Sequence, residues 1–310
     1  MKKIFVTLAV ITFFILGCLI GFYFMFPSSI AEILIHLNRS NSGLSKKQIK
    51  LPNGLETIYL EGGTGETIVL LHGAGQNKDN FTEMSRFLTD KYHVIIPDRI
   101  GYGESSKPMD IDYSPIAQSE YILQLLNALD IQQFHLVGSS QGGQIAMIYT
   151  HLNSERVKSL FLLNAYGVQS VPRTELMQKI HDSKDNFAPI HSIDEFKEFL
   201  GFFYHKTPYI PGPVLDFIFM QSSENFERDK LIFYQVVYHD IEKVITREDT
   251  PALIIWGDDD KVIHIDGAKV IQKLFPNSQL VIMKDTGHLP MLEKPDETAN
   301  HYFKFLESLQ

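Results

Sequence analysis

One serine stands between glycines where an apolar run gives way to a helical pattern. Residues 138–143 read Gly-Ser-Ser-Gln-Gly-Gly and follow the apolar residues 134–137, and apolar residues at helical spacing come next. A strand, a sharp turn and a helix in this order expose the serine oxygen, and the positive end of the helix faces developing negative charge. Side chains at Gly138 and Gly142 would collide within so tight a turn. The pattern therefore predicts Ser140 as a nucleophile.

A serine nucleophile needs a base, and the base needs a carboxylate that orients it. The predicted strand, sharp turn and helix around Ser140 form what is called a nucleophile elbow. In chains with such an elbow, the acid and then the histidine follow the serine in the sequence. The apolar residues 252–256 predict a strand, and residues 258–260, three consecutive aspartates, come directly after it. The last predicted strand, residues 280–283, runs into Asp-Thr-Gly-His, which ends at His288. These positions predict His288 as the base and leave the acid open among the three aspartates.

A further glycine-containing turn could stabilise an oxyanion. Residues 67–71 predict a buried strand that runs into His-Gly-Ala-Gly at residues 72–75. Such a turn supplies one backbone N–H, and the residue after the nucleophile supplies another. We therefore predict that the amides of Ala74 and Gln141 point at the carbonyl oxygen as it becomes negatively charged. His72 itself is expected to be structural.

Strand patterns alternate with helical patterns over most of the chain, which indicates a parallel sheet covered by helices on both faces. Asn53-Gly54 predicts a hairpin turn near the beginning of the sheet. A stretch without strand pattern predicts an inserted helical cap, and its many aromatic residues are expected to line an apolar channel. The predicted divisions are an anchor (1–27), a juxtamembrane helix or linker (28–46), the first part of the core (47–171), the cap (172–250) and the second part of the core (251–310).

The beginning of the sequence predicts one transmembrane helix. Residues 4–26 are 23 residues without a charge, and a helix of that length spans about 34 Å against a bilayer core of about 30 Å. The two lysines before it would stay in the cytoplasm, so a single-pass protein would hold its catalytic domain outside the cytoplasm or in a lumen. Cleavage at residues 29–31 and lipidation of Cys18 are the alternatives. Apolar positions within residues 30–37 recur at helical spacing and are expected to lie on the membrane or to pack on the domain.

Composition excludes several classes of function. Cys18 is the only cysteine, so the chain forms no intramolecular disulfide. The formal net charge is −9 and there is no basic run, which argues against nucleic acid as a partner. The histidines lack the H-E-x-x-H spacing and any tight cluster, so neither a catalytic metal nor a cofactor is expected.

Four motifs together resemble those of a known family. They are the elbow, His-Gly-Ala-Gly, Trp-Gly-Asp-Asp-Asp-Lys-Val at 256–262, and Thr-Gly-His-Leu-Pro-Met-Leu-Glu-Lys-Pro at 286–295. Over roughly residues 45–309 the chain resembles the α/β-hydrolases. Within them it is similar to membrane-anchored monoacylglycerol lipases (the α/β-hydrolase-domain-containing protein six type) and to bacterial lipases and esterases. The resemblance implies the α/β-hydrolase fold and a lipid esterase.

The resemblance also selects the acid. In the family pattern it lies two residues before the valine of the Trp-Gly turn, which favours Asp260 over Asp258 and Asp259. One departure is Gln141, because many relatives carry methionine after the nucleophile, and this leaves the polarity of the acyl pocket open.

The implied reaction is hydrolysis of a carboxylic ester through an acyl-enzyme, most simply of a monoacylglycerol. Ser140 would attack, His288 would take its proton, and Asp260 would orient His288. The same site could instead cleave a carbon–carbon bond in a diketone or open a lactone. A non-catalytic binding module on this fold would be expected to have lost one of these three side chains, and all three are present.

Overall fold

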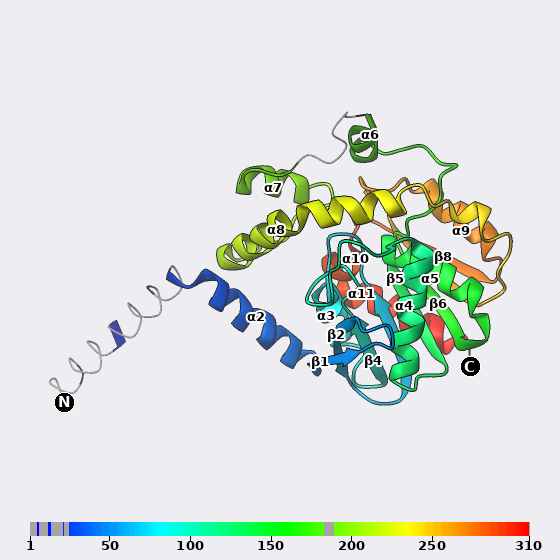
Figure 1. Ribbon diagram of the computed structural model, residues 1–310, viewed down its shortest axis with the longest axis horizontal. Coiled ribbons are helices and arrows are strands. Elements are labelled where there is room, and N and C mark those ends of the chain that lie inside the picture. The colour runs from blue at the N-terminus through cyan, green and yellow to red at the C-terminus, as the bar shows by residue number, and fades with distance from the viewer. Residues whose placement is uncertain (1–4, 6–11, 14–20, 22–24, 183–188, 310) are drawn as a thin grey trace.

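An eight-stranded sheet organises the chain, which the computed structural model describes over residues 5, 12–13, 21, 25–182 and 189–309 (Figure 1). The strand order is β1-β2-β4-β3-β5-β6-β7-β8. Strands β3 to β8 run parallel, while β2 is antiparallel to β1 and to β4. This confirms the predicted mostly parallel sheet. The strands are β1 (Leu44–Lys50), β2 (Glu56–Gly62), β3 (Glu66–Leu71), β4 (Tyr92–Pro97), β5 (Phe134–Ser139), β6 (Val157–Leu163), β7 (Ala252–Gly257) and β8 (Ser278–Met283).

The predicted hairpin joins the first two strands. Leu44 pairs with Gly62 and Lys50 with Glu56 in an antiparallel register. The turn between them contains Gly54 at φ +89°, a conformation that glycine adopts without steric cost. The expectation from Asn53-Gly54 is therefore confirmed.

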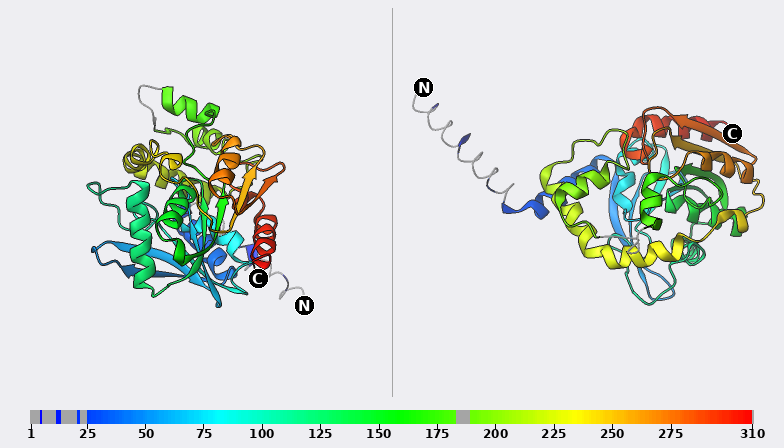
Figure 2. Two further views of the ribbon diagram at one scale, coloured as in Figure 1. Left: turned by 90° about the vertical axis from the view of Figure 1, so that its right-hand side faces the viewer. Right: turned by 90° about the horizontal axis from the view of Figure 1, so that it is seen from above.

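Side chains of the central strands are buried on both faces of the sheet. On β6, Leu160 and Leu162 belong to the core under α4, α5 and α9, while Phe161 and Leu163 belong to the core under α3, α10 and α11. Continuous apolar runs are typical of strands covered on both sides. The covering helices are α3 (Thr82–Ser85), α4 (Pro115–Ala128), α5 (Gln141–Leu152), α9 (Asp266–Leu274), α10 (Pro290–Glu293) and α11 (Pro295–Glu307). Figure 2 shows the sheet between these two layers.

Helices fill the segment between β6 and β7. They are α6 (Glu175–Asp182), α7 (Ile193–Leu200), α8 (Gly212–Val236) and the 3-10 turn η3 (Ile241–Lys243), and the described residues of this segment include no strand. The backbone N–H of His288, after β8, donates to the carbonyl of Phe203. The helical segment therefore lies over the carboxyl ends of the strands (Figures 1 and 2), in the stretch where we predicted a cap.

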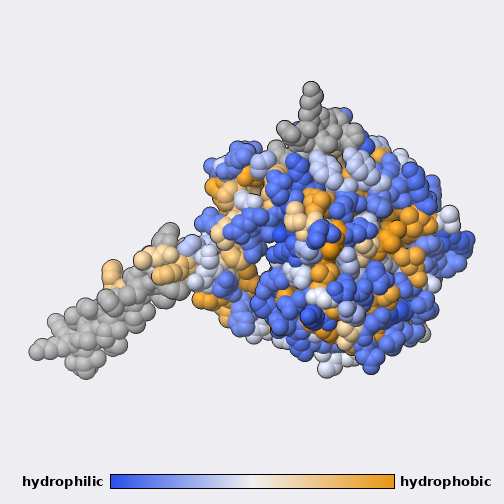
Figure 3. Space-filling model, viewed as in Figure 1, coloured by the Kyte–Doolittle hydropathy of each residue, from blue (hydrophilic) through white to orange (hydrophobic). Residues whose placement is uncertain are grey.

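Helix α2 (Pro27–Asn41) precedes the sheet and packs along α8. Its Arg39 binds Asp79 through two hydrogen bonds of 2.6 Å each. Four apolar side chains nevertheless remain exposed at its beginning and along it, namely Phe26, Ile33, Leu34 and Leu37. Figure 3 shows apolar residues on this side of the protein.

The predicted transmembrane segment, residues 4–26, lies mostly outside the described residues. Within the part of the chain that the structure describes, no helix is both long enough and apolar enough to cross a bilayer.

The buried sheet predicts a large difference between two leucine truncations. Leu162 is 0% exposed near the end of β6, whereas Leu152 is 55% exposed at the end of α5. Leu162→Ala should lower the free energy of unfolding by about 2–5 kcal/mol because it leaves a cavity. Leu152→Ala should change it by no more than about 0.5 kcal/mol. Denaturant titration measures both, and equal losses would contradict this description of the core.

Candidate active site

Ser140 occupies a strained turn between β5 and α5. Its φ is 53° and its ψ −122°, a region that residues with side chains rarely adopt. A Cβ built on Gly138 would lie 2.4 Å from the carbonyl oxygen of Gly142, and one built on Gly142 would lie 2.2 Å from that of Leu71. The expected collisions are therefore confirmed. The Ser140 side chain makes no capping hydrogen bond to α5, so its hydroxyl is not used to stabilise the beginning of the helix.

His288 and Asp260 form a buried pair. The distance between His288 Nδ1 and Asp260 Oδ2 is 3.0 Å, and their side chains are 1% and 0% exposed. The other two aspartates of the run, Asp258 and Asp259, face different groups, which are Thr286, His205 and Lys261. Of the three carboxylates, that of Asp260 is thus the one in contact with His288.

The Asp260 carboxylate is held on both oxygens. Oδ1 accepts hydrogen bonds from the amides of Val262 (2.8 Å) and Ile263 (3.0 Å), and Oδ2 accepts one from Asn164 Nδ2 (2.6 Å). Asn164 is fully buried directly after β6, at φ 45°. Sequence reasoning missed this residue. The available signal was an asparagine at the end of an apolar strand, because asparagine tolerates positive φ better than most residues.

The three predicted side chains follow strands β5, β7 and β8, whose carboxyl ends share one edge of the sheet. The cap covers this edge at His288, because the ring of Phe203 lies edge-on to the imidazole at 5.8 Å. Asp260 and His288 are joined by a hydrogen bond. None of the hydrogen bonds in the described part of the chain joins the Ser140 side chain to His288.

The His-Gly-Ala-Gly turn lies against the elbow. A Cβ built on Gly73 would be 3.0 Å from Ser140 Cβ. No hydrogen bond from the amide of Ala74 or of Gln141 to another described residue is observed. Gln141 is the first residue of α5, where the N–H has no partner within the helix. Neither predicted donor is therefore engaged by another described residue, and Gln141 directly follows Ser140.

The Gln141 side chain points away from solvent into a polar network. It is 4% exposed, and its Oε1 accepts hydrogen bonds from Arg99 Nη2 (2.6 Å) and from the Tyr102 hydroxyl (3.1 Å). Burial raises the pKa of the Tyr102 hydroxyl. The Gln141 side chain, where many relatives carry methionine, therefore contacts buried residues of the core. Sequence reasoning did not identify Arg99 as one of these contacts.

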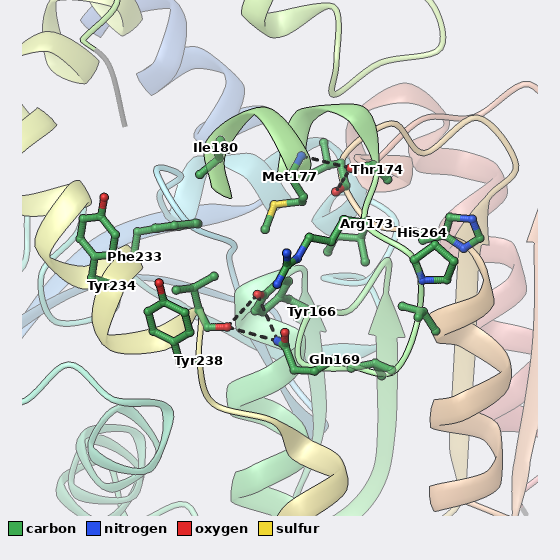
Figure 4. Close-up of a pocket in the computed structure, with 16 residues that line it drawn as sticks. Tyr166, Gln169, Arg173, Thr174, Met177, Ile180, Phe233, Tyr234, Tyr238 and His264 are labelled. Carbon is green, nitrogen blue, oxygen red and sulfur yellow. Dashed lines mark hydrogen bonds between the residues drawn. The ribbon is translucent and has the colours of Figure 1, made fainter. Parts of the chain in front are cut away.

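A pocket of about 70 Å³ lies between α6, the end of α8 and the loop after β7 (Figure 4). Its lining includes Val262 and Ile263, whose amides hold Asp260, and Tyr166, whose amide donates to the carbonyl of Ser140. Ser140 and His288 do not line it. The pocket thus borders the acid side of the site. Among the described residues, no group of three or more His, Cys, Asp or Glu side chains could hold a metal ion.

Residues 66–295 match the family described as the alpha/beta hydrolase fold. The chain belongs to this family. Among α/β-hydrolases, Lipase 1 of Psychrobacter immobilis is 36% identical over 283 residues, which cover 89% of each protein. The monoacylglycerol lipase ABHD6 of Rattus norvegicus is 24% identical and covers 93% of this chain and 89% of its own. The crystal structure of a membrane phospholipase A is similar with a TM-score of 0.87 at 31% identity, over 100% of this chain and 99% of that one.

A carboxylate of the cap lies near the polar network of this α/β-hydrolase. Asp229 on α8 has a side chain that is 18% exposed, with Arg228 Nη2 at 3.5 Å from its Oδ1. Burial raises the pKa of Asp229 from 3.8 to about 6, although Arg228, Lys107 and Arg99 act to lower it.

This raised pKa predicts a loss of stability with rising pH. The folded state binds the proton of Asp229 more tightly than the unfolded state, so its contribution is complete below pH 3.8 and is lost as the pH rises through about 6. Relative to Asp229→Asn, the free energy of unfolding of the wild type should fall by up to about 3 kcal/mol between pH 4 and pH 7. Denaturant titrations across this range measure the difference, with Asp216→Asn, at an exposed position of the same helix, as the control. Parallel curves for the wild type and Asp229→Asn would contradict the prediction.

Proposed function

We propose that this α/β-hydrolase is a serine hydrolase that cleaves carboxylic esters of acyl lipids, with monoacylglycerols as the preferred class. The observation that carries the proposal is the buried Asp260–His288 pair at the sheet edge that also holds Ser140 and the two available amides. The names of the relatives, which are lipases and a monoacylglycerol lipase, support the substrate class.

The contact between Asp260 and His288 supports a specific set of proton transfers in the proposed reaction. Because Asp260 accepts a hydrogen bond at His288 Nδ1, the neutral ring carries its proton there and leaves Nε2 as the base. Nε2 takes the proton of Ser140 as its oxygen attacks the ester carbonyl, and the amides of Ala74 and Gln141 bind the resulting oxyanion. His288 then gives the proton to the departing alcohol. Water, activated by the same nitrogen, releases the acid from the acyl-enzyme.

We propose that residues 4–26 anchor the protein in a membrane, with the N-terminus in the cytoplasm and the catalytic domain outside it or in a lumen. The uncharged sequence of this segment supports the anchor. So do the exposed apolar side chains Phe26, Ile33, Leu34 and Leu37 at the beginning of α2 and along it. An esterase of membrane lipids placed in this way meets its substrate at a surface.

Two substitutions test the catalytic roles. Ser140→Ala should remove nearly all hydrolysis of 4-nitrophenyl butyrate and all labelling by a fluorophosphonate probe, because no other residue supplies the attacking oxygen. Asp260→Asn should lower kcat roughly 10⁴-fold, because it leaves the tautomer and the charge of His288 unsupported. Asp258→Asn and Asp259→Asn are the matched controls and should stay close to the wild type. Labelling at another residue, or a crippled Asp258→Asn, would refute the assignment.

The length of the acyl chain tests the lipid substrate. Each buried CH₂ can contribute up to about 0.8 kcal/mol, so kcat/KM should rise several-fold for each two carbons until the apolar channel is full. Rates measured from acetate to decanoate esters below micelle formation, and with monoacylglycerols, check this. A flat or falling series would favour a small-ester, lactone or carbon–carbon bond hydrolase.

Membrane fractionation tests the anchor. The full-length protein should stay with membranes through high-salt and carbonate washes, because an apolar helix resists both, and removal of residues 1–26 should release most of it. Immunoblots of the fractions and the mass of the mature N-terminus measure the outcome. A chain that begins at Glu32 or at a lipidated Cys18 would replace the anchor with one of its alternatives.

A further inference from the structure

A guanidinium is buried directly behind the proposed oxyanion site. Arg99 lies in the loop after β4, is 1% exposed and packs over the ring of Tyr102 at 4.6 Å. Its Nη2 donates to the carbonyl of Gly73 (3.0 Å) and to Gln141 Oε1 (2.6 Å). Its Nε and Nη1 are buried and have no hydrogen-bond partner among the residues that the structure describes.

This arrangement is costly for stability. Arginine stays protonated in proteins, and burial of a charge without a contacting counter-charge is strongly unfavourable. Among the described residues, no carboxylate forms an ion pair with Arg99. Both acceptors of Nη2 belong to the two segments that carry the proposed oxyanion donors, Ala74 and Gln141. The destabilising buried charge of Arg99 therefore lies beside the proposed oxyanion site, where a positive charge would stabilise the negative charge that develops during the reaction.

The Gly73 carbonyl and the Ala74 N–H belong to one peptide group. That carbonyl accepts hydrogen bonds from Arg99 Nη2 and from His72 Nδ1 (2.8 Å). His72 Nε2 accepts from the backbone N–H of Arg99 (3.1 Å), so the proton of the neutral ring is on Nδ1. The two bonds of a trans peptide group point in opposite directions. Holding the carbonyl on Arg99 and His72 therefore aims the Ala74 N–H away from them.

The second donor is fixed from the same group. Gln141 contributes its backbone N–H to the proposed site, and its side chain reaches back to Arg99 and Tyr102. Rotation of the first turn of α5 would break these two hydrogen bonds. One nitrogen of Arg99, Nη2, thus donates hydrogen bonds to both segments that carry a proposed oxyanion donor. A methionine at position 141 would offer no comparable acceptor.

We propose that Arg99 is a positioning residue for the oxyanion hole, which it holds in register through the Gly73 carbonyl and the Gln141 side chain. The inference rests on the proposed function. Because the negative charge appears only as the ester is attacked, loss of this positioning lowers kcat and leaves KM nearly unchanged.

The test compares Arg99→Met and Arg99→Lys in the full-length protein, with Arg86→Met, at an exposed position, as the matched control. It measures kcat and KM for 4-nitrophenyl butyrate, and Ki for a trifluoromethyl ketone with the same acyl chain, which forms a tetrahedral oxyanion adduct on serine. Arg99→Met should lower kcat about 10- to 100-fold, less than the roughly 10²- to 10³-fold loss when a donor is deleted outright. Ki should rise by a similar factor while KM changes less than about threefold. Arg99→Lys should recover part of both losses, and Arg86→Met should match the wild type.

A second variant keeps the test decisive if Arg99→Met does not fold. Gln141→Met leaves the buried arginine in place and removes one of its acceptors, so kcat and the affinity for the ketone should fall together, by a smaller factor. Where the double variant folds, its loss should be smaller than the product of the two single losses, because both substitutions break the same contact.

The outcomes separate this inference from the proposed function. A folded Arg99→Met with wild-type kcat, or with a raised KM and an unchanged Ki, overturns the positioning role. So does a Gln141→Met that leaves both kcat and Ki unchanged, even though Ser140→Ala is inactive. A wild-type protein that neither hydrolyses esters nor reacts with a fluorophosphonate overturns the proposed function, and the inference with it.

Discussion

The close approach of backbone to backbone at the carboxyl ends of the strands is the constraint on which this structure depends. A Cβ on Gly142 would lie 2.2 Å from the carbonyl oxygen of Leu71, and one on Gly257 would lie 2.2 Å from that of Gly287. No side chain fits at either place. The first contact seats the elbow against β3, and the second brings the aspartate turn against the histidine loop. The glycines that mark these motifs in the sequence are thus the points where the backbones of two segments are in close contact.

Features set by local spacing could be predicted from the sequence. The elbow, the Asn-Gly hairpin and the buried strands follow from neighbouring residues, and the structure contains them. The choice among the three aspartates could not be made from local chemistry, because the residues are identical. The turn separates them, since the amides of Val262 and Ile263 capture the carboxylate of Asp260.

Residues that act across the fold escaped sequence reasoning. Asn164 reaches Asp260 only because β6 lies beside β7, and Arg99 reaches Gln141 only because the loop after β4 folds behind the elbow. The spacing within residues 30–37 predicted a helix, but the identity of its packing partner, α8, depends on a tertiary contact. Such contacts join residues far apart in the chain, and no periodicity in the sequence encodes them.

The position of the helical segment between β6 and β7 has a consequence for the order in which the protein is made. The elbow and the His-Gly turn belong to strands that are synthesised before this segment, whereas Asp260 and His288 follow strands that come after it. Domains generally fold as units, so the single sheet is completed only after β7 and β8 have been made. A nascent chain therefore carries its serine without the pair proposed to activate it. Under this assignment, reactivity begins only when strands β7 and β8 have docked on the rest of the sheet.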